Sequence, residues 1–193
     1  MQIYVISLTS SGKRVFLPQT DMSMKRIIAI AIIALLLPLA AAAQGGLKKV
    51  YDESIDQNEQ IDQALKAAGA AGKFVVCQVG GNWCPWCLRF ADFIGKDPEI
   101  SKLVADNFVY IHVDYSPRSF KADPAKKQRA EKMMKRLNNP GRFGFPVFVV
   151  LDAKGNVLHI QDSSFLEEGE GYNKDKVLRF FGNWTPKAVL PAN

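Results

Sequence analysis

The sequence predicts an α/β fold, with a central mixed sheet of about four strands and helices on both faces. Two observations lead to it. Short apolar runs bounded by glycine or proline alternate with longer amphipathic segments along residues 51–193, and this alternation is typical of α/β domains. The chain has 193 residues, a length that suits one domain with appendages.

The expected elements follow one another closely. Ile61, Leu65 and Ala68 have helical spacing, so an N-terminal helical extension is expected within residues 52–71. Residues 73–79 form an apolar run between glycines, which predicts a buried strand. Further elements are expected as follows: a helix after residue 87, a helix over 98–107, a strand over 108–115, a helix over 124–137, a strand over 145–151, a hairpin strand over 157–161, an acidic loop over 163–171 and a helix over 174–181.

The charge pattern does not indicate a nucleic-acid partner. The formal net charge is +6, but residues 1–43 carry four basic residues and one acidic residue, so the remainder has 21 basic and 18 acidic residues. A basic face with interleaved aromatic residues would be expected of a nucleic-acid-binding protein. The one basic cluster, within residues 126–136, is interpreted as the solvated face of a helix.

Residues 24–43 have the organisation of a signal peptide. Lys25 and Arg26 precede an apolar run, and Ala41 and Ala43 form a small-residue cleavage pattern. This leader predicts export to the bacterial periplasm, with cleavage after Ala43. An uncleaved membrane anchor is the alternative, although the apolar run is shorter than the roughly 20 residues that span a bilayer.

The leader also sets the expected boundaries. Met24 is a better start for such a signal than Met1, so residues 1–23 are interpreted as a mis-assigned start or an extra leader. Residues 44–50 are expected to form a linker, and residues 51–193 the folded domain.

The main chemical signal is the segment Trp83-Cys84-Pro85-Trp86-Cys87. Two cysteines three positions apart at a helix start can form a disulfide, and the helix dipole stabilises a thiolate at the first of them. Pro85 suits the first helical turn, where a missing N–H has no consequence. Trp83 is expected to flank the exposed sulfur with an apolar surface for substrate peptides, and Trp86 either contacts substrate or caps the motif.

A metal site is the main alternative use of this pair. A Cys-x-x-Cys segment is half of a zinc site, and the only histidines are His112 and His159. A four-ligand site needs both histidines together with Cys84 and Cys87. We expect that the protein binds no metal and no cofactor. Cys77, inside the first strand, is expected to be a core residue.

The order of the expected elements resembles the thioredoxin superfamily. It consists of a strand, a turn, the Trp-Cys-x-x-Cys segment, a helix, a second strand ending at Asp114, and then a strand opening with Phe145-Pro146. The resemblance covers roughly residues 50–185 and is closest to exported thioredoxin-like proteins of the bacterial envelope, some of them disulfide isomerases or proteins of cytochrome c biogenesis. It implies that Cys84 is the nucleophile and Cys87 the resolving thiol.

The resemblance further implies that Pro146 forms a cis peptide bond facing the cysteines, where its backbone pairs with substrate. The sequence departs from thioredoxin at several positions. Gln78 stands where thioredoxin has a buried aspartate, Tyr110 where it has a lysine, and Phe145 where a smaller residue usually precedes the proline. These departures put a thioredoxin-like reducing strength in doubt.

The sequence therefore predicts an exported thiol–disulfide oxidoreductase, a reductase or isomerase. Its expected partners are cysteine-containing client proteins and a membrane redox partner or cytochrome c maturation factors. The alternatives are a net disulfide oxidase, a module that binds copper or zinc through the cysteines, and a peptide-binding scaffold in which the pair is structural.

Overall fold

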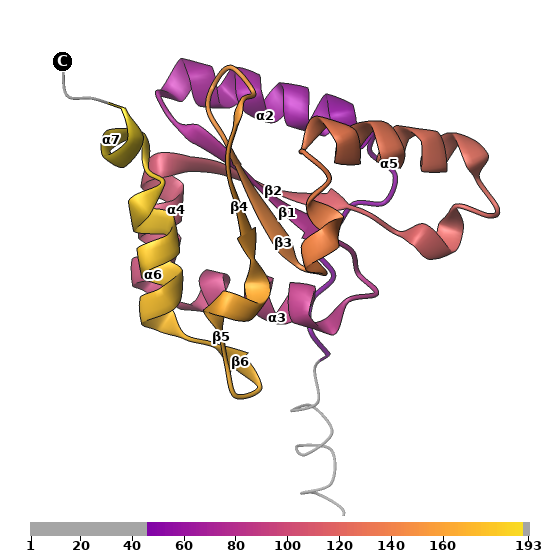
Figure 1. Ribbon diagram of the computed structural model, residues 1–193. Helices are drawn as coiled ribbons and strands as arrows, with labels where there is room; N and C mark the ends of the chain where they lie inside the picture. Colours follow the sequence, from indigo (N-terminus) through magenta and orange to yellow (C-terminus); the bar gives the residue numbers. More distant parts are fainter. Residues whose placement is uncertain (1–45, 191–193) are drawn as a thin grey trace, which may run out of the picture. The chain divides into compact units, whose positions relative to one another are not determined.

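The computed structural model describes residues 46–190, which fold as one compact unit beginning at Leu47 (Figure 1). The expectations about residues 1–23, the signal peptide at 24–43 and cleavage before Gln44 lie outside the described residues. Within 46–190, no helix combines the length and the apolar character that crossing a bilayer demands.

A mixed four-stranded sheet forms the centre of this unit, as predicted. Its strand order is β2-β1-β3-β4. β1 (Phe74–Gly80) runs parallel to β2 (Phe108–Asp114) and antiparallel to β3 (Val147–Leu151). β4 (Val157–Asp162) returns antiparallel to β3 and forms one edge.

Helices cover both faces of the sheet, which the sequence also predicted. Helices α2 (Gln57–Ala71) and α5 (Pro124–Arg136) lie on one face (Figure 1). Helices α3 (Pro85–Lys96), α4 (Pro98–Asn107) and α6 (Lys174–Asn183) lie on the other.

Polar side chains at the helix starts explain where these helices begin. Asp56 accepts hydrogen bonds from the N–H groups of Asn58 and Glu59, and Asp97 accepts from Glu99 and Ile100. Asp123 and Asn173 cap α5 and α6 in the same way. These caps pair amide groups that the first helical turn leaves without partners.

The alternation of side chains along β1 divides the core into two clusters. Phe74 and Val76 pack toward α3, α4 and α6, whereas Val75, Cys77 and Val79 pack toward α2 and α5. Cys77 is fully buried, which raises the pKa of its thiol to about 12. It is a core residue, as expected.

The structure differs from the prediction after β4. Residues 163–171, expected to be a loop, contain a 3-10 turn (Ser163–Leu166) and the strands β5 (Glu167–Glu168) and β6 (Gly171–Tyr172), which pair as a short hairpin. Further short elements were not predicted: 3-10 turns at Pro117–Ser119 and Pro140–Phe143, and helix α7 (Pro186–Val189).

Candidate functional site

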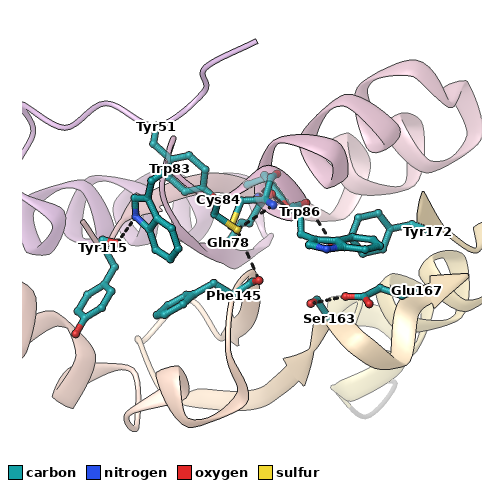
Figure 2. The surroundings of a disulfide bond; sticks show 12 residues. Tyr51, Gln78, Trp83, Cys84, Trp86, Tyr115, Phe145, Ser163, Glu167 and Tyr172 are labelled. Atoms are coloured by element: carbon teal, nitrogen blue, oxygen red, sulfur yellow. Dashed lines mark hydrogen bonds between the residues drawn. A yellow bond between two sulfur atoms is a disulfide. The ribbon is translucent and has the colours of Figure 1, made fainter. Parts of the chain in front are cut away.

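A disulfide joins Cys84 to Cys87 at the point where β1 ends and α3 begins (Figure 2). Cys84 is the N-cap residue of α3 and Cys87 lies in its first turn, with 5.3 Å between the Cα atoms. Pro85 follows as the first helical residue, as predicted, and its side chain is exposed. The strand and helix therefore fix both sulfur atoms on rigid elements.

The two sulfur atoms have different surroundings. Cys84 retains 4% of its surface exposed, whereas Cys87 is fully buried. The Cys87 N–H group donates a hydrogen bond of 3.2 Å to the Cys84 Sγ atom. This N–H group and the positive end of the α3 dipole stabilise negative charge on Cys84 Sγ once the disulfide is reduced.

The turn before β3 brings Phe145 and Pro146 against Cys84. The peptide bond between Phe145 and Pro146 is cis, and Pro146 is buried. The Phe145 carbonyl oxygen lies 3.6 Å from Cys84 Sγ (Figure 2). A reduced Cys84 thiol is therefore within reach to donate a hydrogen bond to this oxygen.

An aromatic surface flanks the disulfide on the side of this turn. Trp83 is 37% exposed and meets the Phe145 ring edge-on, with ring centroids 5.7 Å apart. Phe145 in turn stacks on Tyr115, whose carbonyl oxygen accepts a hydrogen bond of 2.9 Å from the Trp83 indole nitrogen. Tyr115 was not anticipated from the sequence, because its contact with Trp83 joins residues 32 positions apart.

A cavity of about 460 Å³ continues from this aromatic surface. Tyr115, Met134 and Phe145 line it, together with the charged side chains of Glu131 and Arg142. The surface beside Cys84 is therefore apolar next to the sulfur and charged further away.

Trp86 lies on the other side of the disulfide from Trp83 (Figure 2). Its ring meets Tyr172 edge-on at 5.6 Å, and the Arg89 guanidinium group lies 5.0 Å from its centroid. Tyr172 also donates a hydrogen bond to the Trp86 carbonyl oxygen. The Trp86 side chain, which projects from α3, is thus half-buried against the β5–β6 hairpin.

Behind the disulfide, the side-chain amide of Gln78 is fully buried and fully hydrogen-bonded. Its Nε2 atom donates to the Tyr51 hydroxyl oxygen at 2.7 Å and to the Cys87 carbonyl oxygen at 2.8 Å. Its Oε1 atom accepts from the Tyr110 hydroxyl at 2.6 Å. We call these three side chains, Tyr51, Gln78 and Tyr110, the amide–phenol network.

Both phenols of the amide–phenol network stay protonated, because burial raises the pKa of Tyr51 and of Tyr110 above the usual value for tyrosine. Sequence reasoning identified Gln78 and Tyr110 as departures from thioredoxin but missed Tyr51. Nothing in the local sequence around Tyr51 shows that its side chain reaches β1.

Asn82 holds the segment that carries Tyr51. Its Oδ1 atom accepts hydrogen bonds from the backbone N–H groups of Val50 and Tyr51, each 3.1 Å long. Its Nδ2 atom donates to the Tyr51 carbonyl oxygen at 2.8 Å. The loop that precedes the cysteines therefore fixes the backbone on both sides of Tyr51.

Two ionisable side chains of β2 lie near this network. His112 meets Tyr51 and Tyr110 edge-on, and burial lowers the pKa of its imidazole to about 4. Asp114 accepts a hydrogen bond from Ser116 and lies 3.4 Å from the Lys126 ammonium group. Burial raises the pKa of the Asp114 carboxyl.

The ligand set that a zinc site requires is not assembled in the described part of the chain. Across residues 46–190, no three or more His, Cys, Asp or Glu side chains are grouped in a way that holds a metal ion. His159 instead stacks on Trp184, with ring centroids 4.4 Å apart.

Residues 61–162 match the family model described as a thioredoxin-like domain. The chain is also 31% identical over 100 residues to the thiol:disulfide interchange protein DsbD of Cronobacter sakazakii. That match covers 52% of this chain but spans only 15% of the DsbD protein.

Among solved structures, the disulphide isomerase from Xylella fastidiosa is similar, with a TM-score of 0.59 and 22% identity. The likeness covers 71% of this chain and 97% of that one. At 22% identity, this likeness shows that the two proteins share a fold.

Proposed function

Because the chain belongs to the thioredoxin-like family, we propose that it is an exported protein disulfide reductase or isomerase that acts through Cys84 and Cys87. The observation that carries this proposal is the asymmetric disulfide at the start of α3. Cys84 is the less buried of the two residues and its Sγ atom accepts a hydrogen bond from the Cys87 N–H group, whereas Cys87 is fully buried.

The reaction follows from this asymmetry. The Cys84 thiolate attacks one sulfur of a client disulfide, the client S–S bond breaks, and the other client sulfur leaves as a thiolate that takes up a proton. The Cys87 thiolate then attacks Cys84 Sγ and releases the second client sulfur. Two electrons pass to the client, and the Cys84–Cys87 disulfide forms. In an isomerase, a different client thiolate attacks the client sulfur of the mixed disulfide before Cys87 acts, so that a new client disulfide forms and Cys84 leaves as the thiolate.

We assign client binding to the residues around Cys84. Trp83 and Phe145 present apolar rings on one side, and Pro85 is exposed at the helix start. The backbone at Phe145 and Pro146 offers hydrogen-bonding groups beside the sulfur, where a client segment pairs in an extended conformation. Trp86 contributes from the other side, where Tyr172 supports its ring.

The proposed location is the bacterial periplasm, reached through the signal peptide at residues 24–43. Cysteine-containing proteins of that compartment are then the clients, and a membrane redox protein or a cytochrome c maturation factor is the partner that restores the dithiol. Cell fractionation and the mass of the mature N-terminus test this; a mature protein beginning at Gln44 is expected, and an uncleaved chain in the cytoplasm contradicts it.

The first experiment is the reduction potential of the Cys84–Cys87 couple in glutathione or dithiothreitol buffers. A potential near about −270 mV indicates a reductant, and one between about −180 and −120 mV an isomerase or a net oxidase. If no reversible two-electron couple is found, the oxidoreductase proposal fails and metal binding by the cysteines becomes the leading alternative.

A pair of variants tests the two cysteine roles. Cys87→Ser is expected to accumulate mixed disulfides between Cys84 and client proteins in cells, because the resolving thiol is missing. Cys84→Ser is the matched control and is expected to trap none. Equal trapping by the two variants contradicts the assignment of Cys84 as the nucleophile.

A further inference from the structure

The hydrogen bonds of the Tyr51 hydroxyl group follow from the orientation of the Gln78 amide. The Cys87 carbonyl can only accept hydrogen bonds, so the side of the Gln78 amide that faces it is the NH2 group. The same NH2 group donates to the Tyr51 hydroxyl oxygen. Within residues 46–190, no hydrogen bond donated by this hydroxyl is present.

The Tyr51 hydroxyl oxygen and the Cys87 sulfur border the same small space over Gly80. A Cβ atom built on Gly80 would lie 2.5 Å from Cys87 Sγ and 2.9 Å from the Tyr51 hydroxyl oxygen. Glycine leaves this space open, and Tyr51 belongs to the same buried cluster as both cysteines. Figure 2 shows its ring reaching from the N-terminal segment toward the disulfide.

We propose that Tyr51 donates a hydrogen bond to the Cys87 sulfur when the disulfide is open, and that Gln78 positions the phenol for this. The inference rests on the proposed thiol–disulfide exchange. In the resolving step Cys87 loses its proton to water, its thiolate attacks Cys84 Sγ, and the client sulfur leaves and is protonated from water. The Tyr51 hydrogen bond stabilises the buried thiolate, and Tyr51 keeps its own proton throughout.

The surroundings of Tyr51 are those of a hydrogen-bond donor and not of a base that accepts a proton. Burial raises the pKa of Tyr51, so the phenol stays protonated across the range in which thiols ionise. Burial also keeps His112 neutral above about pH 4. The titratable side chains that contact Tyr51 or act on its charge are Tyr110, His112 and Asp114 of β2, Tyr172 of β6 and Cys87 of α3.

The two steps of exchange can be timed separately with Ellman's reagent, dithiobis(nitrobenzoate). The reduced full chain releases one thionitrobenzoate when Cys84 attacks the reagent. It releases a second when Cys87 attacks the mixed disulfide. Stopped-flow absorbance over a range of pH gives the pH midpoint of the second phase, which reports the ionisation of Cys87.

Tyr51→Phe removes the hydroxyl and keeps the ring. We expect the midpoint of the second phase to rise by about one pH unit and this phase to slow roughly tenfold at neutral pH, because a hydrogen bond to a charged group is lost. The first phase stays unchanged. Ser101→Ala is the matched control, because it removes a hydroxyl group that donates to the Ile94 carbonyl oxygen, outside the amide–phenol network and the residues around the disulfide. We expect it to leave both phases as in the wild type.

A second substitution separates a chemical effect from a loss of folding. Site-specific 3-fluorotyrosine at position 51 keeps the phenol but makes it a stronger donor, so the midpoint is expected to fall. An unchanged second phase in Tyr51→Phe, an equal shift in Ser101→Ala, or an upward shift with fluorotyrosine overturns the inference. A wild-type protein that releases no second thionitrobenzoate instead contradicts the proposed exchange function itself.

Discussion

At the scale of single residues, Gly80 is a position where an added methyl group meets both the disulfide and the Tyr51 hydroxyl group. The Cβ atom of Gly80→Ala meets Cys87 Sγ at 2.5 Å, which requires the disulfide or the Tyr51 ring to move. We expect a loss of about 1–3 kcal/mol in the free energy of unfolding, as for other overpacked core sites. Urea denaturation of the oxidised protein measures it.

The matched control is Gly69→Ala in α2, where an added Cβ meets nothing within 4 Å. This substitution is expected to stabilise the protein by up to about 1 kcal/mol through helix propensity. A Gly80→Ala protein as stable as the wild type would show that the space above Gly80 is larger than the structure indicates.

His112 makes the stability of the protein depend on pH. Its pKa is about 4 in the folded protein and about 6.5 when unfolded. The unfolded chain therefore binds more protons between these values, and stability falls as the pH drops through this window. We expect a loss of about 2 kcal/mol between pH 7 and pH 5.

Urea denaturation at both pH values, for the wild type and for His112→Phe, isolates this contribution. The difference between the two pH values is expected to shrink in His112→Phe, whatever the absolute stability of that variant. Asp114 remains in both proteins, so its raised pKa affects both comparisons equally. An unchanged difference would exclude His112 as the source.

The sequence locates the two reacting cysteines of the site but not the roles of Tyr51 and Tyr115 beside them. Cys84 and Cys87 are adjacent to a helix start in the sequence, so their spacing alone gives their geometry. The partner of Gln78 is different, because Tyr51 lies 27 positions away and only the folded chain brings the two side chains together. Tyr115 was missed for the same reason, since the contact between it and Trp83 spans 32 positions.

At the scale of elements, the segment before α2 depends on one side chain. Asn82 bonds to backbone groups of Val50 and Tyr51. Asn82→Ala removes these partners, and we expect a loss of about 1–3 kcal/mol in the free energy of unfolding. Hydrogen exchange is expected to accelerate at the Val50 and Tyr51 amides.

The exchange measurement contains its own control. The amides of β1 pair within the sheet and are expected to exchange only through global unfolding, so local loosening at residues 50 and 51 is distinguishable from a general loss of stability. Slow exchange at these two amides in Asn82→Ala would show that other contacts hold the segment.

Elements with strong local signals agree with their predictions, and weak signals do not. α5 begins as predicted because Asp123 and Pro124 supply a cap and a first turn. Strands β5 and β6 have two residues each, and their glutamates and glycines are typical of loops. Their pairing depends instead on contacts such as the one between Tyr172 and Trp86.

At the scale of the whole molecule, the core cluster on the α3 face holds the turn that faces Cys84. Phe148 is fully buried, two residues after Pro146, with its ring 4.3 Å from that of Phe90 in α3. Phe148→Ala is expected to lower the free energy of unfolding by about 3–5 kcal/mol. Phe165→Ala is the control, because Phe165 is 71% exposed; thermal unfolding of both variants measures the contrast.

The mixed sheet and its helical layers were predictable because apolar runs, turn residues and helix caps all agree along the chain. The strand order was not predicted, because it depends on pairing between segments that are distant in the sequence. An equal loss of stability in the two phenylalanine variants would contradict the division between core and surface.

The position of Tyr51 has a consequence for how such proteins diverge. Residues 61–162 match the family model, and Tyr51 precedes them. A homologue with the same cysteine motif and a different residue at this upstream position is therefore expected to differ in the rate of the resolving step. Grafting the matched domain alone onto another protein transfers the disulfide and leaves its phenol behind.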